Sequence, residues 1–271
     1  MSVSKSLKKV TVPDILNMKA LGEKIVSLTA YDHLMAQLLD ESGIDIILVG
    51  DSAGMVIAGF ESTLPVTMEM MLYHVASVRR GTKRALLVAD MPFLSYQTGW
   101  QKAVQNAGRF LQESGAEAVK LEGGSAIAET VSRLTSLGIP VMGHLDLTPQ
   151  SINKFGSYRL VGQEKGEEKL LFEDARILEE AGAFCIVLEK VPADLAGEIT
   201  TRLKIPTLGI GAGKECDGQV LVSHDMLGLF EKFQPKFVRR YAEIATQMRA
   251  AFEQYSKDVK SGQFPAPDES Y

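Results

Sequence analysis

The sequence predicts an α/β protein, a closed (β/α)8 TIM barrel that forms a single domain over residues 1–271. Short apolar runs rich in β-branched residues alternate with segments of helical apolar spacing along the chain. The runs are continuously apolar, which is typical of parallel strands buried on both faces. Eight such units fit a chain of 271 residues, which is a normal size for one barrel.

Eight segments have the composition of buried parallel strands. They are residues 25–29, 44–49, 85–89, 118–121, 139–143, 184–188, 207–210 and 220–223. The eighth segment is short and follows a polar loop, so its pattern is the least pronounced.

Helices are predicted between these strands, where apolar residues recur every three or four positions. They cover residues 33–41, 67–80, 103–113, 126–137 and 167–180, and a glycine that can cap the helix follows each one. A short leading helix over residues 11–21 is placed to close the barrel floor. A C-terminal helix around residues 240–259 and a loose tail over residues 261–271 complete the domain.

A doubly wound open sheet is the rival fold, and it needs a glycine fingerprint near the first strand. The glycine-rich stretch Gly209–Gly213 instead follows the seventh strand, and Lys214 stands where the fingerprint needs its last glycine. Barrels commonly bind an anion in the loop after strand seven, so this stretch favours the barrel.

The amino-acid composition disfavours several classes of protein and of function. The net charge is −5, with 45% hydrophobic and 23% charged residues, which disfavours disorder and a nucleic-acid-binding role. Cys185 and Cys216 are too few for a disulfide framework, and neither has the neighbours of a zinc site. Without a signal peptide or an apolar run of membrane-spanning length, we expect a cytoplasmic protein that binds neither membrane nor nucleic acid.

Three carboxylates follow the predicted second, third and fourth strands. They are Asp51, Asp90 and Glu122. Neighbouring strands lie about 4.8 Å apart, so these groups converge at the carboxyl end of the barrel. Crowded carboxylates need a counter-charge, and Mg²⁺ is the simplest one. A solvated loop acid or a helix N-cap is the alternative for each acid alone. We also expect such acids to lie outside the hydrophobic core.

Three further side chains occupy the same end of the barrel. Lys120 lies two residues before Glu122 and points the same way, either as a structural ion pair or as a ligand for a substrate anion. His144 ends the fifth strand, as a core histidine or as a ligand contact. Glu189 ends the sixth strand, either as a surface partner of Lys190 or as a general base for a carbon-bound proton.

Seven stretches in this order resemble the ketopantoate hydroxymethyltransferase family. The stretches are residues 28–32, 49–52, 89–92, 119–123, 142–145, 187–189 and 208–213. They cover the chain from the first strand to the seventh, and all the predicted site residues lie within them.

The resemblance implies a barrel of the phosphoenolpyruvate/pyruvate type in a cytoplasmic homo-oligomer, in this family often a decamer. It implies Mg²⁺ as cofactor and the transfer of a one-carbon unit from 5,10-methylenetetrahydrofolate to the 2-oxo acid 3-methyl-2-oxobutanoate. It also implies roles for individual residues. These are Asp51, Asp90 and Glu122 for the metal, Asp51, Ser52, Asp90, Lys120 and His144 around the ketoacid, and Glu189 as the proton acceptor.

Two other functions remain open from the residues alone. A Mg²⁺-dependent C–C lyase acting on a 2-oxo or hydroxy acid would use the same carboxylates but no folate. A barrel kept as a binding or scaffold module would need no carboxylate cluster. The Met-rich helix from Thr67 and the C-terminal helix carry more apolar surface than a monomer needs to hide, which favours an oligomer.

Overall fold

The computed structural model describes residues 8–146, 149–151, 165–232 and 235–271. The chain divides into two compact units, one ending at Leu221 and one running from Val222 to Tyr271. Each unit is described by itself, and the prediction of a single domain over the whole chain stays a prediction.

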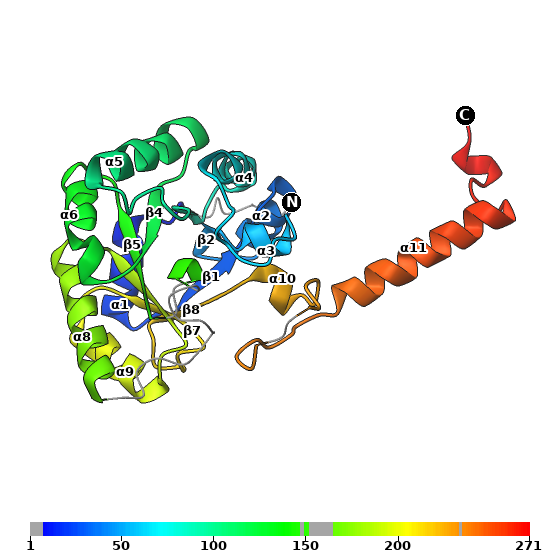
Figure 1. Cartoon of the computed structure of the whole chain (residues 1–271). Helices are drawn as coiled ribbons and strands as arrows, with labels where there is room; N and C mark the ends of the chain where they lie inside the picture. Colours follow the sequence, from blue (N-terminus) through cyan, green and yellow to red (C-terminus); the bar gives the residue numbers. More distant parts are fainter. Residues whose placement is uncertain (1–7, 147–148, 152–164, 233–234) are drawn as a thin grey trace. The chain divides into compact units, whose positions relative to one another are not determined.

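The first unit is a closed barrel of eight parallel strands, as the sequence predicts (Figure 1). The strands are β1 (Ile25–Thr29), β2 (Ile46–Val49), β3 (Leu86–Asp90), β4 (Ala118–Glu122), β5 (Val141–Asp146), β6 (Cys185–Glu189), β7 (Thr207–Ile210) and β8 (Gly218–Leu221). Each strand pairs with the next along the chain, and β8 pairs with β1 to close the barrel.

The strand boundaries correct the sequence prediction in several strands. Strand β2 begins at Ile46 rather than at residue 44, and β5 begins at Val141 rather than at residue 139. Strands β3 to β6 continue into the charged residues that we expected to follow them, because backbone pairing extends into the barrel mouth. Strand β8 begins at Gly218 rather than at residue 220. A Cβ atom at Gly218 would lie 2.2 Å from the Ile25 carbonyl oxygen, so only glycine permits this approach of β8 to β1.

The helices that surround the barrel match the predicted segments closely. They are α2 (His33–Glu41), α4 (Met68–Gly81), α5 (Trp100–Arg109), α6 (Ala128–Ser136) and α8 (Lys165–Glu180). A π-helical turn, Phe110–Ser114, continues α5, and a 3-10 turn, Ser125–Ile127, precedes α6. The side chains of Asp32 and Thr67 cap α2 and α4 by accepting hydrogen bonds from backbone N–H groups.

Two helices of the barrel unit were not predicted, the short α3 (Ala53–Val56) and α9 (Ala193–Arg202). Gly81 is also not the cap that we expected, because it is the last residue of α4. A Cβ atom there would lie 2.4 Å from the His33 carbonyl oxygen, so Gly81 permits α4 to pack closely against α2.

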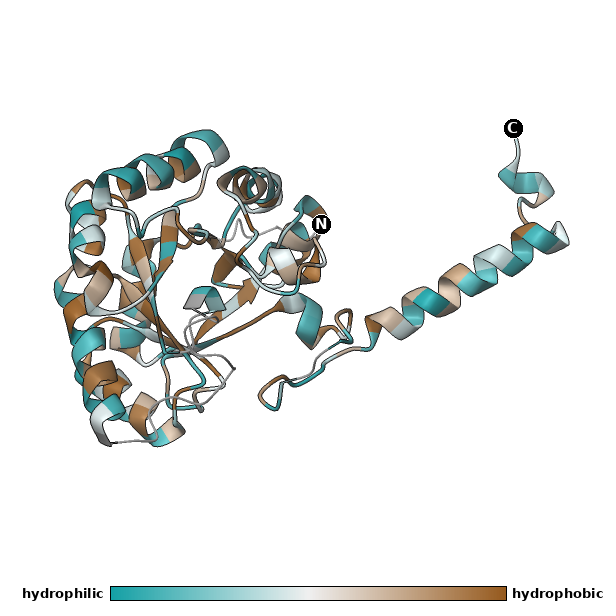
Figure 2. Cartoon of the chain, viewed as in Figure 1, coloured by the Kyte–Doolittle hydropathy of each residue, from teal (hydrophilic) through white to brown (hydrophobic). Residues whose placement is uncertain are grey.

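Two apolar clusters hold the barrel unit together. One lies between the strands and the helices, and the other contains the inward-facing strand residues below the barrel mouth. Ile15 of the leading helix α1 (Val12–Leu21) belongs to the inner cluster and is fully buried, consistent with a helix that closes the floor. Figure 2 shows the strands mainly hydrophobic and the surrounding helices with hydrophilic outer faces.

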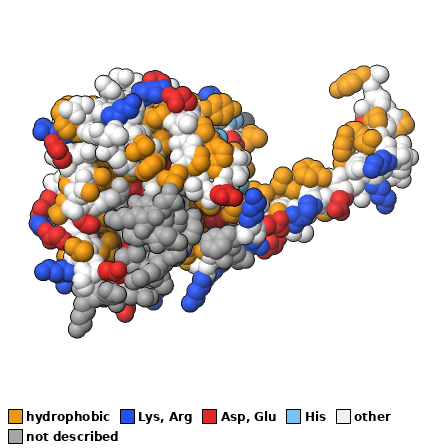
Figure 3. Space-filling model, viewed as in Figure 1, with side chains coloured by type: hydrophobic (Ala, Val, Ile, Leu, Met, Phe, Trp, Pro, Cys, Tyr) orange, Lys and Arg blue, Asp and Glu red, His pale blue; other side chains and the backbone are white. Residues whose placement is uncertain are grey.

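The second unit contains α10 (Ser223–Met226), α11 (Ile244–Ser261) and a 3-10 turn, Pro267–Glu269. Helix α11 begins four residues later than predicted, and the side chains of Met248, Phe252 and Tyr255 are exposed along it. Figure 3 shows hydrophobic side chains spaced along this helix. Among the helices that the structure describes, none has both the length and the apolar character needed to cross a membrane.

Candidate active site

The carboxyl ends of β2 to β6 bring the predicted chemical residues to one end of the barrel. Asp51 and Ser52 follow β2, Asp90 is the last residue of β3, and Glu189 is the last residue of β6. Residues Lys120 and Glu122 lie in β4, and His144 lies in β5. Strand register aligns Asp90 with Lys120 and Glu122 with His144, so these side chains are neighbours across the sheet.

A chain of charged contacts runs across this end of the barrel. The Lys120 Nζ atom lies 2.5 Å from Asp90 Oδ1 and 3.7 Å from Glu122 Oε1. The His144 Nδ1 atom lies 3.3 Å from Glu122 Oε1, and its Nε2 atom lies 3.3 Å from Glu189 Oε2. One connected cluster therefore contains two of the predicted metal acids, the lysine, the histidine and the predicted base. Asp51 joins it through its backbone N–H, which donates to Asp90 Oδ2 at 3.2 Å.

The three acids are buried at the barrel mouth, although neither apolar cluster contains them. Asp51, Asp90 and Glu122 are only 4%, 2% and 6% exposed. The strands keep pairing beyond their apolar residues, so their last side chains still point into the enclosed barrel mouth. Burial of such charges costs free energy unless they are paired. The stability of the site therefore depends on which cations and hydrogen-bond donors contact these acids.

Lys120 is the paired cation of this cluster, as one reading of the sequence anticipated. Burial alone would lower the pKa of Lys120, but the charges of Asp90 and Glu122 outweigh burial and raise it. Burial, together with the nearby charges of Asp90 and Glu122, raises the pKa of Asp51 well above its usual value. Three acids therefore share one ammonium group, and Asp51 retains its proton more readily than a free carboxyl group does.

His144 connects the metal acids with Glu189. Burial and the Lys120 charge would lower the pKa of His144, but contacts with Glu122 and Glu189 raise it to about 9. A protonated imidazole balances part of the negative charge between the two glutamates. Contacts with Glu122 and Glu189 therefore hold His144 in place, both as a core histidine and as a ligand contact.

The donor set fits a hard divalent cation. Carboxylate oxygens are the ligands that Mg²⁺ prefers. The Glu122 Oε1 atom is buried and accepts no hydrogen bond among the described residues, and its charged neighbours are His144 Nδ1 at 3.3 Å and Lys120 Nζ at 3.7 Å. In the described part of the chain, no three Asp, Glu, His or Cys side chains already stand in the arrangement of a metal centre. The ammonium group of Lys120 and the amide of Gln150 instead contact Asp90 and Asp51.

Sequence reasoning missed four residues of this site. Tyr31 contacts Ser52 through their hydroxyl groups, 2.8 Å apart. Tyr96 and Gln150 form hydrogen bonds with Glu122 and with each other. These three carry no charge, and Tyr96 and Gln150 lie in connecting segments, so no strand-end pattern identifies them.

Asp146 is the fourth missed residue, and it lies at the end of β5. Its backbone has a φ of 79°, in the left-handed region, and both carboxylate oxygens are buried without hydrogen-bond partners among the described residues. Burial raises the pKa of Asp146 to about 7. The sequence did not predict Asp146 as a site residue because the predicted fifth strand ended at residue 143, whereas β5 continues to Asp146.

The fold and the position of this cluster define the class of protein. The chain is a (β/α)8 barrel whose ionisable residues gather at the carboxyl ends of its strands, where barrel enzymes carry their active sites.

The family model described as Ketopantoate hydroxymethyltransferase matches residues 9–267, and the chain belongs to this family. A relative from Syntrophus aciditrophicus, named 3-methyl-2-oxobutanoate hydroxymethyltransferase, is 57% identical over 271 residues and covers 100% of both chains. A relative of the same name from Chlorobaculum tepidum is 56% identical over 98% of this chain and 97% of its own.

Solved structures confirm the fold at much lower sequence identity. Phosphonopyruvate hydrolase in complex with oxalate and Mg²⁺ aligns with a TM-score of 0.62 and 12% identity, covering 96% of this chain and 93% of its own. A 2,3-dimethylmalate lyase of the PEP mutase/isocitrate lyase superfamily aligns with a TM-score of 0.60 and 15% identity, covering 95% and 92%. The predicted phosphoenolpyruvate/pyruvate type of barrel agrees with these neighbours.

Proposed function

We propose that this protein transfers a hydroxymethyl group to 3-methyl-2-oxobutanoate, which gives 2-dehydropantoate for pantothenate biosynthesis. Full-length relatives with this activity in their names support the proposal. The observation that carries it is the buried cluster that links Asp90, Lys120, Glu122 and His144 to Glu189. We propose 5,10-methylenetetrahydrofolate as the one-carbon donor, with tetrahydrofolate as the second product.

The carboxylates of Asp51, Asp90 and Glu122 would hold Mg²⁺. Phosphonopyruvate hydrolase, which shares the fold and was solved with oxalate and Mg²⁺, supports this choice of metal and ligand class. When bound, the metal would act as a Lewis acid that stabilises negative charge on the keto oxygen. Lys120 would attract the ketoacid carboxylate, and Ser52, held by Tyr31, would donate a hydrogen bond to it.

Glu189 would remove the proton from C3 of the ketoacid. Its side chain is 15% exposed, compared with 3% for Glu122, so it can reach a substrate above the buried acids. The contact with His144 Nε2, 3.3 Å from Glu189 Oε2, would orient the carboxylate. The C3 carbanion would then form the new C–C bond to the one-carbon unit. The two C–N bonds between this carbon and the folate would break with release of tetrahydrofolate, and water would supply the hydroxyl group.

A C–C lyase activity on the same barrel is the weaker candidate. Likeness to 2,3-dimethylmalate lyase rests on 15% identity and concerns the fold. The relatives at 56% and 57% identity are named as hydroxymethyltransferases instead.

We propose that the protein acts as a cytoplasmic homo-oligomer, with a decamer as the assembly that the family resemblance suggests. Exposed apolar side chains support a subunit interface, with Leu34 70%, Leu38 61% and Tyr73 71% exposed on α2 and α4. Sedimentation should show an assembly several times larger than the 29.5 kDa chain. A single species near the chain mass would contradict the proposal.

Deuterium exchange tests the proposed chemistry without the folate. In D₂O with Mg²⁺ and 3-methyl-2-oxobutanoate, the enzyme should exchange the C3 proton, because its removal is reversible. Proton NMR would show the isopropyl CH signal fading and the methyl doublet collapsing. If no exchange occurs either alone or with a bound folate analogue, the proposed function is wrong.

A further inference from the structure

Gln150 contacts the metal acids from a different segment than the strands that carry them. It lies in the 3-10 turn Pro149–Ser151 after β5, and it is 5% exposed. Its Nε2 atom donates to Asp51 Oδ2 at 2.9 Å, and its backbone N–H donates to Glu122 Oε2 at 3.1 Å. One buried residue therefore holds one oxygen of each of two acids.

The orientation of the Gln150 amide follows from its other partners. Its Nε2 atom also lies 2.9 Å from the carbonyl oxygen of Met91, which can only accept a hydrogen bond. Its Oε1 atom faces the hydroxyl of Tyr96 at 2.8 Å and the amide of Gln97 at 3.1 Å. The donor side of the amide must therefore face Asp51.

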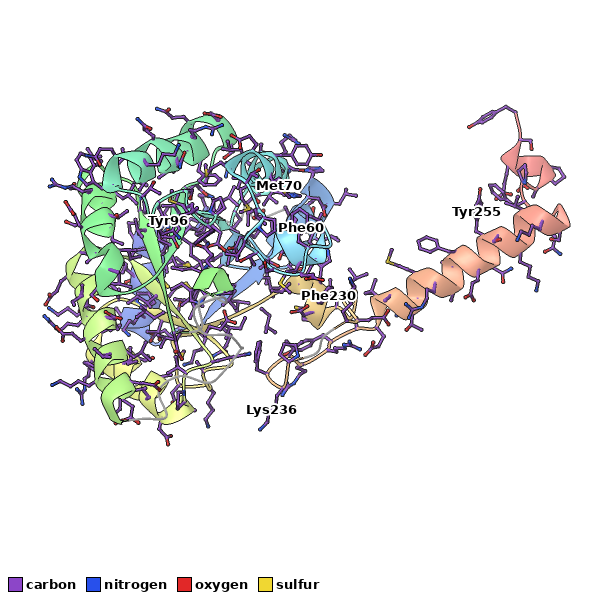
Figure 4. The ribbon with its side chains drawn as sticks, viewed as in Figure 1. Phe60, Met70, Tyr96, Phe230, Lys236 and Tyr255 are labelled. Atoms are coloured by element: carbon purple, nitrogen blue, oxygen red, sulfur yellow. The ribbon has the colours of Figure 1, made fainter. Side chains whose placement is uncertain are left out.

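Tyr96 completes the network from the loop after β3. It is 1% exposed, and its hydroxyl accepts a hydrogen bond from the Glu122 backbone N–H at 3.0 Å. The single hydroxyl proton has two acceptors within reach, Gln150 Oε1 at 2.8 Å and the Glu122 carbonyl oxygen at 3.1 Å, and the shorter distance favours Gln150. Tyr96 belongs to the apolar cluster between the strands and the helices, and Figure 4 labels it in the barrel unit. Tyr96 thus fixes both the end of β4 and the Gln150 amide.

We propose that Gln150 and Tyr96 are positioning residues that hold Asp51 and Glu122 ready for the metal. This inference rests on the proposed function, because it assumes a cation between these acids. The hydrogen bonds of Gln150 occupy Asp51 Oδ2 and Glu122 Oε2, while Glu122 Oε1 has no hydrogen bond among the described residues. The network therefore fixes Asp51 Oδ2 and Glu122 Oε2. The Glu122 Oε1 atom faces His144 Nδ1 at 3.3 Å and Lys120 Nζ at 3.7 Å, so a cation that binds this oxygen would compete with both groups.

The affinity of the protein for Mn²⁺ tests this role directly. Gln150→Met keeps the approximate volume but removes the amide, and Tyr96→Phe removes only the hydroxyl. Outer-shell partners of metal ligands typically contribute about 10- to 100-fold to metal affinity. We expect Gln150→Met to weaken Mn²⁺ binding within that range, measured by electron paramagnetic resonance of free Mn²⁺, and Tyr96→Phe to weaken it less.

Gln97→Met is the matched control, because Gln97 donates to the same Gln150 oxygen from an exposed position. It should bind Mn²⁺ like the wild type. At saturating Mg²⁺, Gln150→Met and Tyr96→Phe should recover most of the wild-type rate of C3 proton exchange.

Wild-type affinity for Mn²⁺ in both Gln150→Met and Tyr96→Phe would overturn the inference while leaving the proposed function intact. A loss of exchange that persists at saturating Mg²⁺, with unchanged Mn²⁺ affinity, would also overturn it. If Gln150→Met does not fold by circular dichroism, Tyr96→Phe alone decides. Failure of the wild type to bind Mn²⁺ at all would refute both the metal assignment and this inference.

Discussion

The floor and the mouth of the barrel are built on the same strands but from opposite chemistry. On β3, Leu86 and Val88 belong to the inner apolar cluster, and Asp90 follows two residues later on the same face. On β4, Ala118 lies in that cluster, whereas Lys120 points into the mouth. All five side chains are nearly fully buried, so burial does not distinguish the two regions.

Burial has opposite effects on the free energy of folding in the two regions. Apolar residues of the floor gain about 25 cal/mol for each Å² of surface removed from water. Buried charges at the mouth lose hydration, and their mutual contacts must offset that loss. The floor therefore stabilises the fold, and the mouth uses part of that stability to hold reactive groups. Substitutions in the two regions should separate activity from stability.

Glu189→Gln should give the largest effect on activity. The variant keeps the shape of the side chain but cannot accept the C3 proton, so exchange in D₂O should fall by about 10²- to 10⁴-fold. Mn²⁺ affinity should stay near that of the wild type, because Glu189 is not a proposed metal ligand. If exchange continues at the wild-type rate, another group is the base.

Asp90→Asn should reduce both the affinity for Mn²⁺ and the stability of the fold. Loss of a proposed metal ligand should weaken Mn²⁺ binding by more than the roughly 100-fold that outer-shell changes reach. The variant should also unfold at a lower denaturant concentration, because the buried Lys120 loses its partner at 2.5 Å. Titration with Mn²⁺ and urea unfolding measure the two effects. Full activity at limiting Mg²⁺ would disprove the metal assignment.

Leu86→Ala should show the opposite behaviour from Glu189→Gln. Leu86 is 2% exposed in the floor, four residues before Asp90 on the same face. Removal of a buried leucine side chain costs about 2–5 kcal/mol of unfolding free energy. Urea unfolding should detect this loss, while the folded fraction should keep wild-type Mn²⁺ affinity. A large loss of Mn²⁺ affinity would show that floor and mouth are coupled.

The sequence predicted the barrel because its periodic features are local. Continuous apolar runs and helical spacing identify the strands and most helices without knowledge of contacts. Strand ends were less accurate, because an apolar criterion stops at the first charged residue. Strand β5 illustrates the error, since pairing continues through His144 to Asp146.

The sequence predicted the site residues that are charged and lie at predicted strand ends. It did not predict the uncharged site residues in connecting segments. Asp51, Asp90 and Glu122 stand out against apolar strands. Gln150 lies 99 residues from Asp51 in the chain, and only the folded structure brings its amide to that carboxylate. An uncharged glutamine in a connecting segment also gives no local signal, because its importance depends on which acceptors surround it.

Asp146 gives the smallest expected effect in the comparison of floor and mouth. It lies at the mouth and has no hydrogen-bonded partner among the described residues. Its φ of 79° lies where glycine fits without strain, and other residues pay about 1–2 kcal/mol. Asp146→Gly relieves this strain but adds freedom to the unfolded chain. We therefore expect a net stabilisation of about 1 kcal/mol, measured by urea unfolding.

The effect of Asp146 should also depend on pH, with a defined sign. Burial raises its pKa from 3.8 to about 7, so the folded state binds the proton more tightly than the unfolded state. The contribution of Asp146 to stability is then fully present below pH 4 and is lost as the pH rises through 7. Asp146→Asn removes the charge and tolerates the left-handed backbone. Its stability relative to the wild type should therefore increase from pH 4 to pH 8. An unchanged difference across that range would show that Asp146 ionises freely, and that the mouth accommodates its charge without cost.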